Sequence, residues 1–221
     1  MIIKECSLCE AVLLEYQSYF RYVFTGEPST TLVSPMLTDA EKQQLLTTAR
    51  QTIDAAVRGK RIPPHHARSS GLESPGSAFV TLRVDDELRG CIGYIEPIKP
   101  LIETVQEVAV KAALEDFRFN PVQEHELQDI SSEISVLSEL RHISDIQEIE
   151  VGKHGILMES RGLRGLLLPQ VAVEQRWDRE TFLTQTARKA GLPPMIWQQP
   201  NVKIFIFTAE IFHEVNDTKA V

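Results

Sequence analysis

The chain has 221 residues and a formal net charge of −8, enough length for one domain or two small ones, each with a buried core. Its acidic balance, with no run of Lys and Arg, argues against nucleic acid or an acidic membrane surface as the main partner. Three cysteines cannot form a disulfide framework, the N-terminal segment lacks the apolar core of a signal peptide, and no uncharged apolar run reaches the roughly 18 residues of a membrane span. We therefore expect a cytoplasmic globular protein without a membrane segment.

The first 36 residues are expected to form a helix and a linker. Apolar and aromatic side chains recur at helical spacing over residues 8–24, and the polar, turn-rich segment after them is typical of a linker. The helix either docks on the core of the chain or serves self-association or a partner. Cys6 and Cys9 form a CxxC pair, but no second pair exists, so no metal is expected there.

The next element is expected to be a helix that ends near residue 57. Thr38 and Glu41 have the spacing of a capping box at its start. The long loop that follows contains His65 and His66. They lack a third ligand at suitable spacing, so we expect them in solvent rather than on a metal.

A β-hairpin is predicted over Ala78–Tyr94, AFVTLRVDDELRGCIGY. We place Val84 opposite Leu88 across a three-residue acidic loop, because a two-residue loop would shift the register and mix the two faces. In this register Arg83 lies opposite Arg89. The core face then carries Val80, Leu82, Val84, Leu88, Ile92 and Tyr94, and the other face carries Phe79, Thr81, Arg83, Arg89, Cys91 and Gly93.

The second face of this hairpin is the candidate site. Arg83 and Arg89 would repel each other, so an anion or a carboxylate of the chain is expected between or near them. Gly90 and Gly93 leave room for a ligand or another backbone segment. Cys91 is either a nucleophile, its thiolate stabilised by the nearby guanidinium, or a small strand residue packed under a helix. No histidine is close in sequence, so a base for this thiol would have to come from elsewhere in the fold.

A third helix is expected from residue 100 to a turn that contains Asp116 and Arg118. This charged pair, beside two phenylalanines, is either a brace for the turn or part of an anion site, and both alternatives stay open. The following segment, Ile130–Ser138, alternates in hydrophobicity as a strand does, with Glu133 on its less apolar face. Glu133 is therefore added to the candidate binding residues.

The second half of the chain is predicted to repeat this plan. Leu-Arg-Gly occurs at Leu88–Gly90 and again at Leu163–Gly165, which suggests an internal duplication, although three residues can also coincide by chance. The predicted fold class is α+β, an antiparallel sheet with packed helices, with halves at 37–140 and 141–214 and a tail at 215–221. The expected second copy consists of a hairpin of His154–Glu159 and Arg164–Val171, a helix capped by Asp178, and a long strand over Asn201–Glu214.

Five segments in order resemble the AMMECR domain family, which includes the protein of the Alport-syndrome deletion region and, in bacteria and archaea, AmmeMemoRadiSam system protein A. They are LRGCIGYIEP, DFRFNPV, SEISVLSEL, LLLPQVAVEQRWDRETFL and RKAGLPP, and they place the resemblance at about residues 37–214. Phe117 stands where the family usually has proline, and Ala187-Arg188 where many members have a cysteine, so a mechanism with two thiols is not expected.

The resemblance implies an α+β fold with antiparallel sheet and a functional cleft around the LRGCIG motif, which would contain Arg89, Gly90, Cys91 and Gly93. It also implies a shared pathway with a Memo-type protein and a radical-SAM protein. It supplies no cofactor and no reaction. Two functions are therefore kept: a component that acts on a small anionic molecule, with Arg89 holding the anion and Cys91 near the reacting atom, or a non-catalytic module for protein partners.

Overall fold

The structure, a computed structural model, describes residues 36–214. The predicted helix over residues 8–24, the Cys6 and Cys9 pair and the tail at 215–221 lie outside the described residues. Among the helices of the described part, none is both long and apolar enough to cross a membrane.

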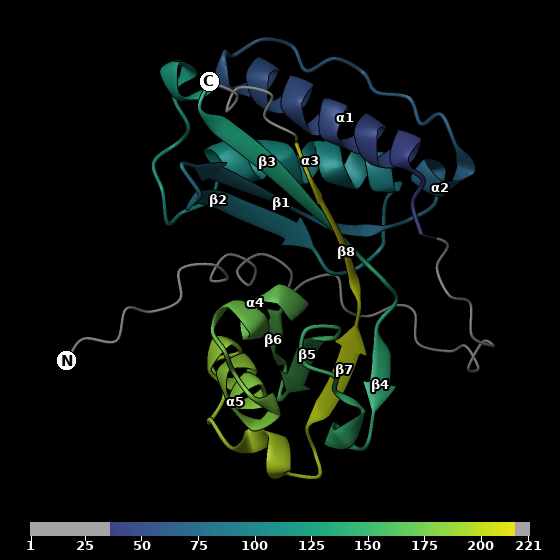
Figure 1. The fold of residues 1–221 in the computed structure, drawn as a ribbon, viewed down its shortest axis with the longest axis vertical. Coiled ribbons are helices and arrows are strands. Elements are labelled where there is room, and N and C mark those ends of the chain that lie inside the picture. The colour runs from purple at the N-terminus through teal and green to yellow at the C-terminus, as the bar shows by residue number, and fades with distance from the viewer. Residues whose placement is uncertain (1–35, 215–221) are drawn as a thin grey trace.

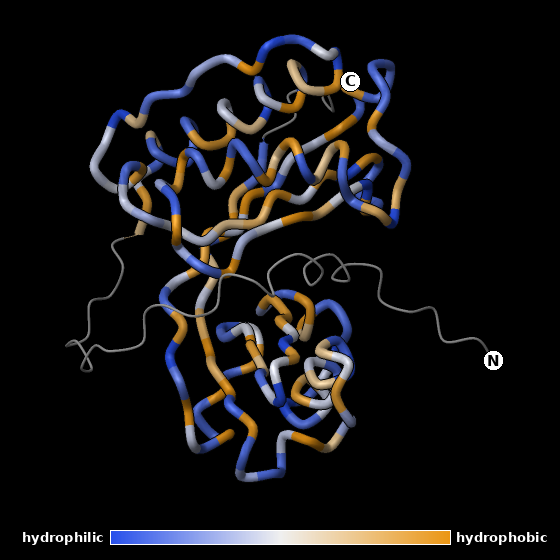
Figure 2. The backbone as a smooth tube through the Cα atoms, turned by 180° about the vertical axis from the view of Figure 1, so that it is seen from behind, coloured by the Kyte–Doolittle hydropathy of each residue, from blue (hydrophilic) through white to orange (hydrophobic). Residues whose placement is uncertain are grey.

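The first lobe is a four-stranded antiparallel sheet with two long helices on one face (Figure 1). The capping box at the start of the first helix is confirmed, because the Glu41 amide donates to Thr38 Oγ1 at 3.3 Å and the Thr38 amide to Glu41 Oε2 at 2.8 Å. The helices alternate between apolar and polar residues along the chain, as Figure 2 shows, and their apolar sides meet the sheet. In order β2-β1-β3-β8, the strands are β2 Glu87–Tyr94, β1 Ser77–Val84, β3 Ile130–Leu137 and β8 Ala209–His213; the helices are α1 Asp39–Val57, α2 Ser70–Glu73, α3 Leu101–Leu114 and the 3-10 turn η1 Glu124–Glu126.

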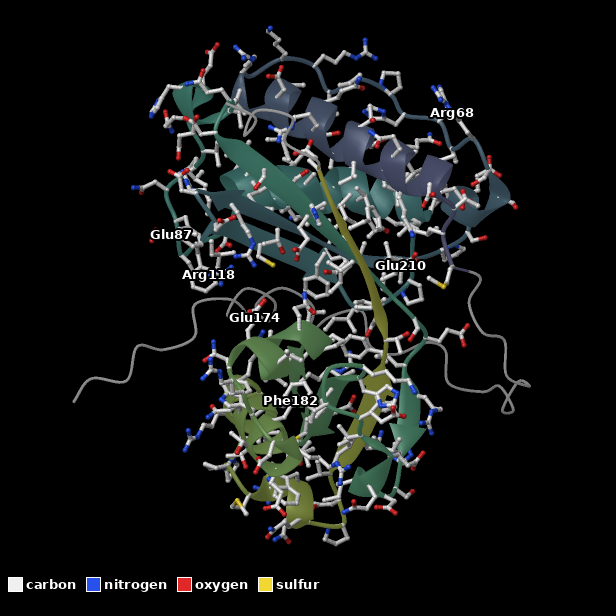
Figure 3. All side chains as sticks on the ribbon, viewed as in Figure 1. Arg68, Glu87, Arg118, Glu174, Phe182 and Glu210 are labelled. Carbon is white, nitrogen blue, oxygen red and sulfur yellow. The ribbon has the colours of Figure 1, made fainter. Side chains whose placement is uncertain are left out.

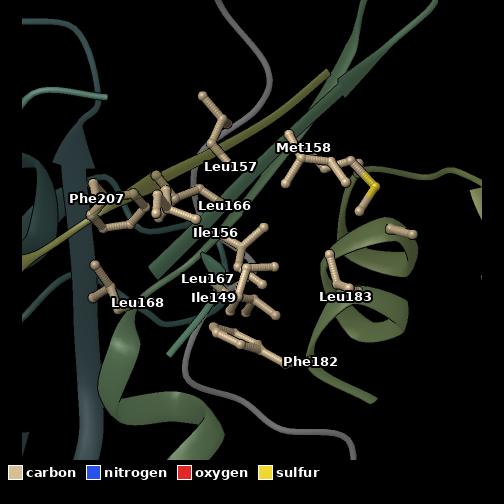
Figure 4. Packing of buried hydrophobic residues seen from close by; sticks show 14 of the residues in the cluster. Ile149, Ile156, Leu157, Met158, Leu166, Leu167, Leu168, Phe182, Leu183 and Phe207 are labelled. Atoms are coloured by element: carbon tan, nitrogen blue, oxygen red, sulfur yellow. The ribbon is translucent and has the colours of Figure 1, made fainter. Parts of the chain in front are cut away.

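The second lobe is also a four-stranded antiparallel sheet, and helices α4 and α5 pack against it. Side chains from β5, β6 and α5 converge on a core that contains Phe182 and Phe207 (Figure 4). The predicted cap of the last helix is confirmed, since Asp178 Oδ1 accepts the Thr181 amide at 2.8 Å. In order β4-β7-β5-β6, the strands are β4 Arg141–Ile143, β7 Lys203–Phe207, β5 Gly155–Ser160 and β6 Leu163–Leu167; the helices are α4 Pro169–Glu174, α5 Arg179–Lys189 and the 3-10 turns η2 Ile146–Glu148 and η3 Ile196–Gln198.

The two sheets exchange a strand. β4 follows β3 in the chain but pairs with β7, and β8 follows β7 but pairs with β3. The predicted single strand over Asn201–Glu214 is therefore wrong: it is two strands in two sheets, separated at Thr208. The crossing connections meet where the Ser138 amide donates to the Thr208 carbonyl at 2.9 Å. The strand order β2-β1-β3 in the first sheet corresponds to β6-β5-β7 in the second, which is the order that a repeated unit of hairpin, helix and strand would produce. An origin of the two lobes by duplication stays a prediction.

The repeated Leu-Arg-Gly has a packing role in both lobes. A Cβ on Gly90 would overlap the backbone carbonyl of Ala112 in α3. A Cβ on Gly165 would overlap Ala190, directly after α5. In each lobe the glycine therefore lets a strand lie directly against a helix, which is the close backbone approach expected of glycine within a strand.

The predicted register of the first hairpin is wrong. Asp85 and Asp86 alone form the loop, both with positive φ (50° and 67°), as a two-residue hairpin turn requires. Arg83 then pairs with Leu88 and Leu82 with Gly90, so the register skips one residue, Arg89. This bulge restores the alternation that a two-residue loop would otherwise have shifted.

Candidate functional site

The sheet of the first lobe has one face that turns away from α1 and α3 and toward the second lobe. Phe79 and Cys91 on this face belong to the same cluster of buried residues as Leu168 and Val171, which lie at and beside the start of α4. Figure 1 shows α4 next to this side of the sheet. The lobe-facing side of the sheet is therefore where residues of both lobes meet.

A row of four polar side chains crosses the lobe-facing side. Cys91 pairs with Thr81, Thr81 with Glu133, and Glu133 with His213, on four adjacent strands. Directly opposed residues in antiparallel strands share a face with Cβ atoms about 4.5–5.5 Å apart, so the row is continuous. Cys91 and Thr81 are only 6% and 4% exposed, Glu133 is half-buried and His213 is exposed. The row thus runs from a buried thiol to the solvent.

Within this row, Glu133 is a carboxyl group whose pKa the fold raises. Burial, the largest effect, raises the pKa of Glu133; Arg83 opposes it, Glu174 of α4 adds a smaller raising effect, and His213 a smaller lowering one. Within residues 36–214, its carboxyl group has no ion pair or hydrogen bond. At the other end of the row, the Thr81 hydroxyl donates to Cys91 Sγ at 3.2 Å. Glu133 is consequently a carboxyl group that holds a proton more readily than an exposed glutamate does.

Two further polar groups near this row lack partners. Ser135 is 1% exposed, and its hydroxyl has no hydrogen-bond partner. It lies two residues after Glu133, hence on the same side of β3. From the other lobe, Gln170 Oε1 in α4 is also buried without a partner, four residues before Glu174 and so on the same side of that helix. Figure 3 shows Glu174 at the end of α4 nearest the sheet of the first lobe. Buried polar groups without partners are uncommon, and a site for a ligand is one physical reason for them.

The two arginines predicted to face each other lie apart. Arg83 stays on the lobe-facing side, where its Nη1 donates to the Asp86 carbonyl at 3.1 Å, and no carboxylate of the described chain pairs with it. Arg89 occupies the bulge and pairs with Glu126 through bonds of 2.7 and 3.0 Å. The predicted opposition of Arg83 and Arg89 is therefore wrong, because the bulge turns Arg89 toward the segment after α3.

The two glycines of the motif do not leave space for a ligand. The backbone of α3 occupies the space above Gly90. The sequence predicted that either a ligand or another backbone segment would approach this glycine, and the structure shows the backbone segment. A Cβ on Gly93 would overlap the ring of Phe79, which lies on that glycine in the neighbouring strand. Both glycines thus serve packing of the chain against itself.

Asp116 and Arg118 bind the backbone of Cys91 at the edge of the sheet. The Cys91 amide donates to Asp116 Oδ2 at 2.8 Å, and Arg118 Nη2 donates to the Cys91 carbonyl at 3.3 Å. Arg118 and Asp116 also form an ion pair of 2.6 Å. Burial raises the pKa of Asp116, but the hydrogen bonds from Arg118 and from the Cys91 amide outweigh it, so this pKa is lowered. The structure shows this pair bracing the strand that carries the thiol, while the alternative of a part in an anion site stays a prediction.

Sequence reasoning placed Arg83, Cys91 and Glu133 in the candidate site, and the structure brings these three to one side of the sheet. It missed His213, Glu174 and Ser135 as site residues. The sequence carried a signal for Ser135, which shares the alternation of Glu133 along its strand. It carried none for His213 or Glu174, because their approach depends on the strand exchange and on the packing of the two lobes.

Two surface hollows lie away from this row. Two hollows of about 380 and 370 Å³ adjoin η3 in the second lobe, the first lined by His142, Trp197 and Lys203 among others, the second by Met195. Neither includes a residue of the polar row. Among the described residues, no group of three or more His, Cys, Asp or Glu side chains is arranged to hold a metal ion.

The fold and the row together define a class: a two-lobed α+β protein whose paired antiparallel sheets exchange a strand and enclose polar side chains between the lobes. The chain belongs to the AMMECR1 family, whose model matches residues 46–212. Two archaeal relatives are a protein of Thermococcus kodakarensis, TK0174, 44% identical over 182 residues (77% of this chain and 88% of that protein), and a protein of Methanothermobacter thermautotrophicus, 42% identical over 187 residues (79% and 94%). The crystal structure of the uncharacterised protein PH0010 from Pyrococcus horikoshii is similar, with a TM-score of 0.77 and 39% identity over 80% of this chain and 93% of that one.

Proposed function

We propose that the chain binds a small anionic molecule beside the LRGCIG hairpin, on the lobe-facing side of the sheet, and works as a component of a modification pathway with Memo-type and radical-SAM proteins. The observation that supports this binding site is the environment of Arg83. Its guanidinium lies on the side of Cys91 and Thr81 and has no carboxylate partner in the described part of the chain, whereas Arg89 is held by Glu126. A guanidinium without a carboxylate is the natural partner of a ligand carboxylate or phosphate. The pathway rests on the family resemblance.

In this proposal Arg83, not Arg89, holds the anion. Cys91 lies one strand away from Thr81, so a ligand held at Arg83 extends along the row toward the Thr81 hydroxyl and the thiol. The brace of Asp116 and Arg118 keeps the Cys91 backbone in place for this ligand. The residue that touches the anion and the residue that orients the strand are thus separate.

The test of the binding site is a titration of the full chain with propionate, followed by backbone amide NMR. Arg83→Met should weaken saturable propionate binding at least about tenfold, the size of one partly buried ion pair near 1.4 kcal/mol. Arg68→Met is the matched control, since Arg68 is exposed on the far side of α1 (Figure 3). Equal propionate affinity in wild type and Arg83→Met would refute the site. Co-purification of the full chain with the Memo-type and radical-SAM proteins tests the pathway.

The alternative function, a non-catalytic module for protein partners, is favoured by two other observations. Cys91 is nearly sealed in an apolar cluster, which suits a packing residue. Phe117, beside the brace, is 70% exposed and offers an apolar contact to a partner. If Cys91→Ser keeps pathway activity while Phe117→Ser abolishes complex formation, the module is the better description.

A further inference from the structure

The two surface hollows of the second lobe meet on the segment between η3 and β7. The first is about 380 Å³ and the second about 370 Å³, and Gln199 and Asn201 line both. Each volume is within the range of about 300–1,000 Å³ that is typical of ligand pockets. Because they share two lining residues, the hollows form one groove, which we call the η3 groove. It lies where β7 begins, at the end of the second lobe that points away from the first lobe (Figure 1).

The charged side chains that line the η3 groove are basic. Lys203 lines the first hollow and Arg161 the second, and no Asp or Glu of the described chain lines either. This bias runs against the composition of the whole chain, which has 31 acidic residues and 23 Lys and Arg residues. A positive groove on a negatively charged protein favours an occupant that is itself negatively charged.

Neither the turn geometry nor an ion pair accounts for the arginine at position 161. Arg161 and Gly162 form the two-residue turn between β5 and β6, with φ values of 53° and 79°. Asn or Asp before glycine suits such a turn better, because a long side chain is disfavoured at positive φ. Within residues 36–214, the Arg161 guanidinium has no ion pair or hydrogen bond. It is therefore available to a carboxylate that comes from outside the chain.

The rest of the lining combines apolar side chains with two carboxamides. Trp197 and Ile146 are among the apolar residues of the first hollow, and Met195, which is exposed, is among those of the second. The side chains of Gln199 and Asn201 are exposed and make no hydrogen bond within residues 36–214. A carboxamide both donates and accepts hydrogen bonds, as a peptide group does. The η3 groove thus offers apolar contacts, peptide-like hydrogen bonding and two cations to the same occupant.

We propose that the η3 groove binds an extended acidic peptide segment of a protein partner, with its carboxylates on Lys203 and Arg161 and its apolar side chains in the two hollows. The peptide backbone bonds the two carboxamides between them. This inference goes beyond the proposed function, since no residue of the polar row takes part in it. Lys203 can take a new carboxylate, because its ion pair with Glu159 is long, at 3.7 Å, and an exposed ion pair contributes little. A peptide can occupy both hollows at once, which a single small anion cannot.

The experiment titrates the full chain with a peptide of repeated Leu-Glu-Glu units whose ends are blocked, and it follows the backbone amide NMR signals of residues 199–203. In an extended chain with about three residues per turn, the leucines share one side and the glutamates flank them. The analogue with glutamine in place of glutamate should bind at least about tenfold more weakly, because it has lost every charge that the two cations attract.

The variants separate a lost contact from a damaged fold. Arg161→Asn and Lys203→Gln should each weaken binding of the acidic peptide at least about threefold. Arg161→Asn should leave the melting temperature unchanged or higher, because asparagine before glycine suits the turn. Arg176→Asn is the matched control, since Arg176 is exposed in the same lobe with a φ of 55° and lines neither hollow. It should change the affinity by less than about 1.5-fold at 0.15 M salt, where charges more than about 8 Å away are screened.

Four results would overturn the inference. Equal affinity for the glutamine analogue would refute an acidic occupant. A loss in Arg176→Asn as large as that in Arg161→Asn would show diffuse attraction by surface charge and would refute the groove. Glutarate, a dicarboxylate without peptide groups, should bind more weakly than the peptide, and equal affinity would show a site for a small molecule instead. Signals that do not saturate by about 1 mM peptide would show that the groove does not recognise it.

Discussion

The sharpest prediction concerns the brace behind Cys91. Asp116→Asn removes the charge that pairs with Arg118, whose side chain is only 9% exposed, and weakens the acceptor of the Cys91 amide. Removing one partner of a buried ion pair costs about 3–5 kcal/mol, because the other charge stays buried. Some hydrogen bonding survives with asparagine, so we expect the lower end, about 3 kcal/mol. At about 2–4 °C per kcal/mol for a domain of this size, the melting temperature should fall by about 6–12 °C.

Thermal unfolding followed by circular dichroism measures this loss for the full chain at neutral pH. Asp129→Asn, an exposed change near the end of the same segment, should shift the melting temperature by less than about 2 °C. The double variant with Arg118→Met should recover part of the stability, because it removes the unpaired charge. Since the pKa of Asp116 is lowered in the folded state, its contribution is complete above the pKa of the unfolded chain and is lost as the pH falls through the folded value. A single variant as stable as the control would refute the brace.

Three further predictions follow from the same sheet. Gly90→Ala should destabilise the chain by about 1–3 kcal/mol in chemical denaturation, since the added methyl group overlaps the Ala112 carbonyl; an unchanged midpoint would contradict the packing. Glu133→Gln should raise the melting temperature at pH 7 and make no difference near pH 4. A carboxyl group with a raised folded pKa stabilises the fold below its unfolded pKa, and this stabilisation is lost as the pH rises through the folded value. A lower melting temperature of the variant at pH 7 would contradict the raised pKa. In a variant that lacks the other two cysteines, Cys91 should react with a thiol reagent at least about a hundredfold faster in denaturant than in buffer, because it is 6% exposed; fast labelling in buffer would show an open thiol.

Local signals in the sequence predicted much of the fold. Thr38 and Glu41 marked the start of α1, and the alternation over Ile130–Ser138 predicted β3, because caps and strand patterns depend on neighbouring residues. The first turn was missed for a physical reason. Aspartate tolerates positive φ, so Asp85 and Asp86 can form a two-residue loop without glycine.

The site was predicted only in part, because its geometry depends on contacts distant in sequence. The bulge at Arg89 is set by the pairing of whole strands and has no local mark, and it separates that guanidinium from Cys91. Glu133 meets His213 only because the last strand returns to the first sheet. The family resemblance correctly predicted the α+β class, but it could not show that Arg83 is the arginine on the side of the thiol.

The strand exchange has a consequence for synthesis of the protein. β3 ends at Leu137, and its neighbour β8 begins at Ala209, about 70 residues later. At about 5–20 residues per second, a ribosome takes several seconds to add that stretch, and meanwhile one edge of β3 has no strand beside it. An open edge is a template for pairing with other chains. Slow translation or truncation before Ala209 should therefore favour aggregates of nascent chains, and a supplied peptide with the β8 sequence should suppress them.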